Sequence, residues 1–233
     1  MSILLDIIKD IVGAKKRQRT SAPVAEAKDD SERLVPAFLN VGGGSKMIPV
    51  PEHFAGWEHV LLDINPTTGA DVICDARELV CFEPAQWDAI YCSHNLEHYY
   101  RHDVRRVLKG FLHVLKENGF AEIRVPDFAG VLDQVFEKKL SLQSVLYQSP
   151  VGPITVHDVI WGYGKEIEES GVDFYAHKTG FAQKDLAEIL LEAGFESVIE
   201  LQPGMLELHV AAFKKPPTES QLSFFGKQVN NIG

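Results

Sequence analysis

Glycines and carboxylates follow or end successive apolar segments of the chain. Gly42, Gly43 and Gly44 follow one segment, Asp63 closes the next, and Asp75 closes the one after. Glycine lets a ligand approach the backbone because no Cβ stands in the way. A carboxylate about 20 residues after such glycines can accept hydrogen bonds from both ribose hydroxyls of a nucleoside, and a second one can accept from an adenine amino group. These residues therefore indicate a nucleoside site, although tight turns and helix caps use the same residue types.

Histidines with metal-ligand spacing follow the next apolar segment. His94, Glu97 and His98 match H-x-x-E-H, a zinc-protease signature, and His102 adds a further step of four residues. Three imidazoles could thus share one helical face around a catalytic zinc ion. The motif directly follows a buried-type strand, however, and there His98 can equally bond its ring to the backbone. We therefore expect that no metal is needed.

Apolar periodicity predicts strands that alternate with helices. Strands are expected at 37–41, 59–64, 70–75, 87–93 and 120–126, followed by a closing pair at 196–202 and 205–215. Helices are expected at 103–119, 128–140 and 182–195. This order predicts an α/β fold with a doubly wound, mostly parallel sheet and an antiparallel closing strand. Ligands of such folds bind beyond the carboxyl ends of the strands, where the residues above lie, together with Asn40, Ser93 and Asp127.

At this point the chain resembles the class I S-adenosylmethionine-dependent methyltransferases over about residues 36–214. The matching series is FLNVGGGSK, VLLDINP, DVICDAREL, WDAIYCSHNLEHY, RVLKGFLHVLKENGFAEIRVPD and HKTGF…LLEAGF. The resemblance implies a Rossmann-like fold and S-adenosylmethionine as the cofactor. It also implies that the glycine loop wraps the methionine part, Asp63 holds the ribose, and Asp75 and Ala76 meet the adenine, with Ser93 and His94 near the sulfonium. The expected cofactor-binding residues are Asn40, Gly42, Gly43, Gly44, Asp63, Asp75, Ala76, Ser93 and His94.

A nicotinamide-dinucleotide oxidoreductase is the nearest alternative. Its G-x-G-x-x-G/A fingerprint begins a helix beneath a pyrophosphate. Here Met47 occupies the third position, and Pro49 and Pro51 follow, so no helix N-terminus is expected to face the loop. S-adenosylmethionine has no phosphate and does not need those backbone amides. A non-catalytic relative that binds the cofactor without turnover also stays open, because no base has a local signature.

Methyl transfer is an in-line displacement at a carbon on a cationic sulfur. It needs a base only if the nucleophile keeps its proton. The expected catalytic residues are His177, His157 and Asp127, and His94 is a further candidate base. The alternative for each is an ordinary polar residue with its hydrogen bonds satisfied.

Residues 141–180 form a long segment that lacks clear periodicity. They combine Trp161, Tyr163, Phe174 and Tyr175 with two histidines. Long irregular segments of compact domains are often lids, and aromatic rings beside hydrogen-bonding groups suit sugars or flat rings. We expect a lid for a small-molecule or glycan acceptor; a covering loop or a dimer arm is the alternative.

Composition limits the partners and the compartment. The apolar share of 45%, the charged share of 24% and the formal net charge of −10 predict a globular protein without a nucleic-acid groove. The 3 cysteines lack CxxC spacing, which favours a reducing, cytoplasmic compartment. No apolar run reaches the roughly 20 residues that span a bilayer.

Both ends of the chain are expected to lie outside the methyltransferase domain. Residues 1–35 read as an amphipathic helix, a basic run and a flexible linker, and residues 215–233 as a loose tail. The helix could pack on the domain or on a sister chain of a homodimer. Its basic flank also allows a weak membrane-surface contact through residues 1–20.

Overall fold

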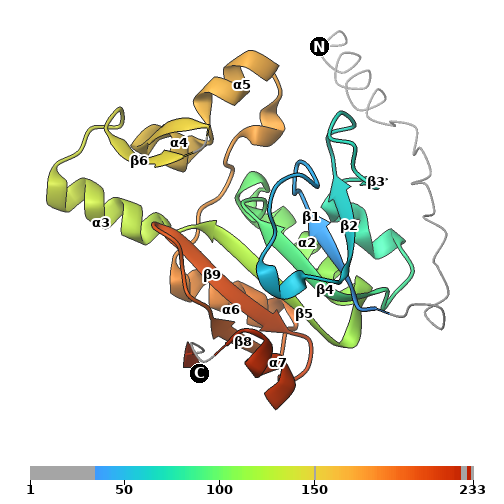
Figure 1. The fold of residues 1–233 in the computed structure, drawn as a ribbon. Helices are drawn as coiled ribbons and strands as arrows, with labels where there is room; N and C mark the ends of the chain where they lie inside the picture. Colours follow the sequence, from blue (N-terminus) through green and yellow to red (C-terminus); the bar gives the residue numbers. More distant parts are fainter. Residues whose placement is uncertain (1–34, 150, 227–229, 232–233) are drawn as a thin grey trace, which may run out of the picture.

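Eight strands form one twisted sheet in the computed structural model, which describes residues 35–149, 151–226 and 230–231 (Figure 1). The strands are β1 (Ala37–Val41), β2 (Glu58–Asp63), β3 (Val72–Ile73), β4 (Trp87–Ser93), β5 (Leu115–Pro126), β8 (Ser197–Glu200), β9 (Glu207–Phe213) and β10 (Asn230–Asn231). Their order is β10-β8-β9-β5-β4-β1-β2-β3. Strands β1 to β5 pair in parallel, and β9 runs antiparallel between β5 and β8. The predicted mostly parallel α/β sheet with an antiparallel closing strand is confirmed.

Helices cover both faces of this sheet. The apolar stripes of α2 (Arg101–Val114) and α6 (Gln183–Ala193) bury against one face, together with the 3₁₀ helix η3 (Ala76–Cys81). An aromatic cluster covers the other face, where η2 (Glu52–Phe54) and α7 (Glu219–Phe224) pack on β1, β4, β5 and β9. Because β1 is buried on both sides, its sequence AFLNV is continuously apolar except for Asn40.

Two predicted boundaries are wrong. Helix α2 ends at Val114 rather than Gly119, because Leu115 already takes an extended conformation and pairs with Trp87 of β4. The predicted loose tail instead contains α7, whose Thr218 forms a capping box with Gln221. Phe224 and Phe225 are partly buried and pack against the aromatic cluster, so this part of the tail is not loose.

Residues 128–180, described except for residue 150, form a small subdomain that we call the cap. The cap comprises α3 (Phe128–Lys138), the hairpin of β6 (Val145–Ser149) and β7 (Gly152–Thr155), α4 (Val156–Trp161), α5 (Gly164–Ser170) and η5 (Asp173–Tyr175). Figure 1 shows it in yellow-green to orange beside one end of the sheet. Residues 141–180 are therefore not irregular: a hairpin and short helices surround a small apolar core of their own.

The two ends of the cap are joined by backbone hydrogen bonding at the carboxyl end of β5. Asp127 and Phe181 form a parallel bridge, and the Phe128 amide donates to the Phe181 carbonyl at 2.9 Å. The cap thus follows the carboxyl end of β5 and returns there before α6.

No helix among the described residues is long and apolar enough to cross a membrane. The predicted N-terminal amphipathic helix and linker lie outside the described residues, so the membrane-surface and sister-chain contacts stay predictions.

Candidate functional site

The loop after β1 is held in a conformation that suits glycine. Gly42 and Gly44 have φ angles of +71° and +66°, in the left-handed region that L-residues with a side chain avoid. A Cβ on Gly42 would clash with the side chain of Asn95, and a Cβ on Gly43 would clash with Asn40. The Gly42 amide donates to the Leu62 carbonyl at 2.8 Å. The loop therefore presents bare backbone next to the carboxyl end of β2.

Asp63 ends β2 and fixes the neighbouring loops with its carboxylate. Its Oδ2 accepts from the Gly44 amide at 3.0 Å, and its Oδ1 accepts from the Asn65 amide at 2.8 Å. The residue is only 7% exposed. A carboxylate oxygen has more than one lone pair, so each oxygen can still accept a hydrogen bond from a ligand hydroxyl.

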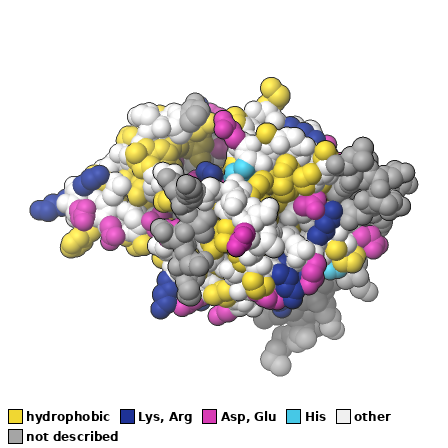
Figure 2. Space-filling view, turned by 60° about the horizontal axis from the view of Figure 1, so that its bottom comes forward, with side chains coloured by type: hydrophobic (Ala, Val, Ile, Leu, Met, Phe, Trp, Pro, Cys, Tyr) yellow, Lys and Arg dark blue, Asp and Glu magenta, His cyan; other side chains and the backbone are white. Residues whose placement is uncertain are grey.

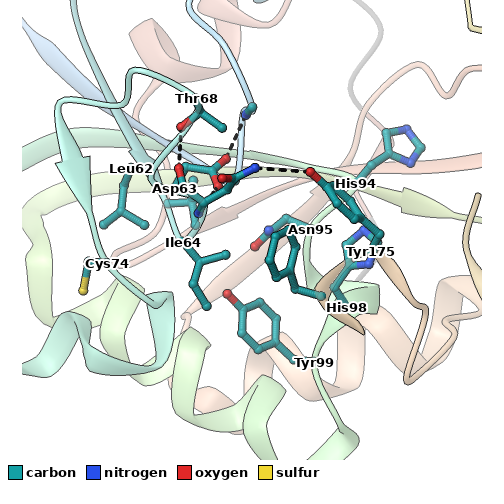
Figure 3. Close-up of a pocket in the computed structure, with 15 residues that line it drawn as sticks. Leu62, Asp63, Ile64, Thr68, Cys74, His94, Asn95, His98, Tyr99 and Tyr175 are labelled. Atoms are coloured by element: carbon teal, nitrogen blue, oxygen red, sulfur yellow. Dashed lines mark hydrogen bonds between the residues drawn. The ribbon is translucent and has the colours of Figure 1, made fainter. Parts of the chain in front are cut away.

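A cavity opens directly beside this carboxylate, and we call it the strand-end cavity. Its lining comprises Val41, Gly42, Gly44, Leu62, Asp63, Ile64, Asn65, Thr68, Cys74, His94, Asn95, His98, Tyr99, Phe174 and Tyr175. Figure 3 shows these side chains converging from the ends of β1, β2 and β4 and from the cap. The Asn65 amide Nδ2 donates to the Tyr175 hydroxyl at 3.3 Å and so joins the sheet to the cap. Buried Asn95 Oδ1 has no hydrogen-bond partner among the described residues, and a ligand donor would satisfy it.

A second cavity lies between the sheet edge and the cap, and we call it the cap cavity. Its lining comprises His94, Glu97, His98, Pro126, Tyr147, Ile154, Asp158, Val159, Tyr163, Glu166, Tyr175 and His177. His94, His98 and Tyr175 line both cavities, so the two spaces share a wall. The space-filling view shows a hollow bordered by hydrophobic side chains, with a histidine beside it (Figure 2).

His94, which lines both cavities, has an unusual backbone conformation and two carboxylate neighbours. Its φ of +49° is unusual for a residue with a side chain. Burial alone would lower its pKa, but Glu207, whose Oε2 lies 2.9 Å from Nε2, and Glu97 raise the pKa to about 10. Burial would raise the pKa values of Glu207 and Glu97, but the imidazolium lowers both. The two carboxylates therefore favour the protonated form of the His94 imidazole.

Four of the nine predicted cofactor residues line the strand-end cavity: Gly42, Gly44, Asp63 and His94. Gly43 and Asn40 support the loop from beneath instead, and the Asn40 amide Nδ2 lies 3.1 Å from His59 Nε2. Ser93 ends β4 without lining the cavity, and Ala76 is buried against α2.

Asp75 is engaged elsewhere in this structure. It caps η3 by accepting from the Arg77 amide, and its Oδ2 pairs with Arg77 Nη2 at 2.6 Å. Its neighbour Cys74 lines the strand-end cavity. The adenine contact proposed for Asp75 stays a prediction, while its role as a cap is observed.

Only one of the three predicted catalytic residues reaches a cavity. His177 lines the cap cavity, and burial lowers its pKa. His157 does not line it and instead packs its ring against Trp161, with ring centres 4.9 Å apart. Asp127 caps α3 by accepting from the Gly130 amide at 3.1 Å. His157 and Asp127 line neither the strand-end cavity nor the cap cavity, and their catalytic roles stay predictions.

The sequence analysis missed several polar and aromatic residues that line the strand-end cavity. These are Asn65, Thr68, Asn95, His98 and Tyr99. Asn65 follows Asp63 by two positions, so its place after a strand was a usable signal. Phe174 and Tyr175 were expected beside the acceptor, yet they also close the strand-end cavity.

Residues 39–123 match the family model described as a methyltransferase domain. That stretch holds the glycine loop and Asp63, so the match agrees with a methyltransferase domain that uses S-adenosylmethionine as its cofactor. A search of curated proteins found no match.

Solved structures with this fold share little sequence with the chain. One is an S-adenosylmethionine-dependent methyltransferase from Thermotoga maritima, described as a possible histamine N-methyltransferase. It is 16% identical with a TM-score of 0.50, and the match covers 79% of this chain and 84% of that chain. A protein from Pyrococcus horikoshii OT3 is also 16% identical with a TM-score of 0.50, over 78% of this chain and 82% of that chain. These likenesses establish the fold.

The strand-end cavity fits the cofactor by its own chemistry. Gly42 and Gly44 line the cavity with backbone in the left-handed conformation, and Asp63 offers acceptors for ribose hydroxyls. Asn95 Oδ1 is an unsatisfied acceptor at the cavity, and the cofactor's ammonium or hydroxyl donors can satisfy it.

Proposed function

We propose that the chain transfers a methyl group from S-adenosylmethionine to a small-molecule or glycan acceptor held in the cap cavity. The observation that carries this proposal is the wall shared by the two cavities. A cofactor on the glycine loop and an acceptor under the cap would meet across His94, His98 and Tyr175. Displacement requires the reacting atoms to be in contact and in line, so the proposal requires the two cavities to join beside these three side chains.

The lining of the cap cavity supports an acceptor with a ring and polar groups. Tyr147, Tyr163 and Tyr175 supply aromatic faces, while Ile154 and Val159 supply apolar surface. His177 and Glu97 add hydrogen-bonding groups on the side nearest the strand ends. Flat rings and sugars pair apolar faces with polar edges, which matches this distribution.

When bound, S-adenosylmethionine would supply a methyl carbon on a cationic sulfur: an acceptor lone pair bonds to the carbon, the carbon–sulfur bond breaks, and the sulfur leaves as a neutral thioether. The chain's residues position the two partners and exclude water from between them. Asp63 and the glycine loop hold the cofactor end, and the cap covers the acceptor end. Tyr175 touches both spaces and, through Asn65, fixes the cap to the sheet.

The test is transfer of a labelled methyl group from S-adenosylmethionine to a panel of hydroxyl- and amine-bearing ring compounds and sugars. Ile154→Phe should fill the cap cavity and abolish transfer while S-adenosylhomocysteine still binds. Val151→Phe is the matched control, because Val151 is 63% exposed on the same cap and lines neither cavity. Normal transfer by Ile154→Phe would place the acceptor elsewhere.

A further inference from the structure

Three metal-ligating side chains converge on one side of the cap cavity. Glu97 and His98 come from η4 (Leu96–His98) at the end of β4, and His177 comes from the end of the cap. One potential ligand atom from each of the three residues lies within 4.8 Å of the others. In sequence, His177 stands far from the other two, so only the fold brings this set together.

Both imidazoles are oriented by backbone carbonyls. His98 Nδ1 lies 3.2 Å from the Ala176 carbonyl oxygen, and His177 Nδ1 lies 2.8 Å from the Val159 carbonyl oxygen. A carbonyl only accepts, so each Nδ1 must carry the proton and donate it. With Nδ1 donating, Nε2 is the nitrogen of each ring that can offer a lone pair to a metal. Metal-bound histidines are usually held in this way, with the second nitrogen donating to a backbone carbonyl or a carboxylate.

Glu97 is a buried carboxylate whose ion pair with His94 leaves both oxygens without a hydrogen bond in the described part of the chain. It is 1% exposed, and neither carboxylate oxygen has a hydrogen-bond partner among the residues that the structure describes. The nearest cation is His94, whose Nδ1 lies 3.5 Å from Oε1. Burying a carboxylate without donors costs free energy that a bound cation recovers. The side chain therefore has unused capacity for a positive ligand beside two imidazole lone pairs.

We propose that Glu97, His98 and His177 bind a divalent transition metal ion of the zinc type, with a remaining coordination position open to the cap cavity. Two imidazoles and one carboxylate suit Zn²⁺ and its neighbours rather than Mg²⁺ or Ca²⁺, which prefer oxygen ligands. The open position would take an oxygen or nitrogen atom of a molecule in the cavity.

This ligand set differs from the H-x-x-E-H interpretation that the sequence analysis set aside. His94 lies outside the converging cluster, and its Nε2 is directed to Glu207 Oε2 at 2.9 Å. His102 is 80% exposed and lies outside the cluster. The expectation that no metal is needed depended on the position of this motif after a buried-type strand and on a backbone bond for the His98 ring. Spacing within one segment could not reveal His177 as a third ligand.

The test is direct metal binding by the full chain without an affinity tag. Protein stripped with a chelator is titrated with Zn²⁺ against a chromophoric competitor, and bound zinc is counted by elemental analysis after dialysis. We expect one zinc per chain, and a loss of affinity of at least tenfold in Glu97→Gln and in His177→Ala. His102→Ala is the matched control and should bind zinc like the wild type.

Two results would overturn the proposal. One is wild-type protein that retains no stoichiometric zinc, and the other is a His177→Ala variant that retains zinc as the wild type does. Binding of S-adenosylhomocysteine by each variant reports that it is folded. Because zinc is counted without an acceptor, failure here is distinct from failure of the methyl-transfer assay.

Discussion

The sheet domain has a much larger buried apolar core than the cap. The core of the sheet runs through α2, α6 and the inner strands, with Leu39, Ile90 and Phe111 at 0% exposure. The fully buried apolar core of the cap consists of Val131, Ile154, Val156 and Val159. A larger buried apolar surface gives a more stable unit. We infer that the sheet provides a rigid floor, whereas the cap can loosen while the sheet stays folded.

The same contrast holds for the two cavities. The strand-end cavity is shaped by backbone, since its glycine loop and Asp63 are joined by amide hydrogen bonds. The cap cavity is shaped by side chains that come from both regions, including Glu97 and His177. Side chains of loops and insertions can change without altering the scaffold. The cap cavity can therefore be adapted to a particular acceptor while the backbone of the strand-end cavity stays the same.

The largest expected effect compares isoleucines in the two cores. Ile123→Ala in β5 should lower the free energy of unfolding of the whole domain by about 2–5 kcal/mol. Ile154→Ala should instead speed hydrogen exchange in the cap and leave the sheet protected. Thermal unfolding and native-state hydrogen exchange measure both effects. Equal loss of protection in the sheet from both variants would mean that cap and sheet unfold as one unit.

A second comparison concerns the histidines of the cap. His177→Ala should reduce the single-turnover rate of methyl transfer by roughly a hundredfold, because His177 lines the acceptor space. Binding of S-adenosylhomocysteine should be unchanged. His157→Ala should keep most of the rate, since its ring packs on Trp161 outside the cavity. The reverse pattern would return His157 to the site.

A third comparison concerns carboxylates at the strand ends. Asp63→Ala removes charge-assisted hydrogen bonds worth about 1.5–3 kcal/mol each, so affinity for S-adenosylhomocysteine should fall at least tenfold by calorimetry. Exposed Asp133 of α3 is the control position, and Asp133→Ala should bind normally. Asp75→Ala tests the expected adenine contact: a similar loss of affinity for S-adenosylhomocysteine would assign that contact to Asp75. Unchanged affinity in Asp63→Ala would remove Asp63 from the site.

The smallest expected effect is on the acid stability of the sheet. Burial would raise the pKa of Glu122, but hydrogen bonds from His209 and His53 lower it; Arg124 also lies nearby. A carboxyl group whose pKa is lowered by folding stabilises the fold above its unfolded pKa of about 4.3, and this contribution is lost as the pH falls through the folded pKa. Stability of Glu122→Gln should therefore converge with that of the wild type in acid. A constant difference down to acidic pH would contradict this.

Sequence patterns predicted the sheet better than the cap, for a physical reason. Buried parallel strands are continuous apolar runs, and residues that follow them meet at one edge of the sheet, so Gly42 and Asp63 could be placed from the chain alone. Cap elements are short and partly exposed, as in β7 and α5, and give little periodicity. The positions of Glu97 and His177 depend on how the cap closes on the sheet, which local spacing does not encode.

The central claim is that the glycine loop and Asp63 hold the methyl donor. Parallel calorimetric titrations with S-adenosylhomocysteine and NADH test it most directly, on the wild type and on Gly42→Val, in which a side chain would clash with Asn95. We predict that S-adenosylhomocysteine binds the wild type and not Gly42→Val, and that NADH binds neither. Tight NADH binding without S-adenosylhomocysteine binding, or equal S-adenosylhomocysteine affinity in both proteins, would contradict the account.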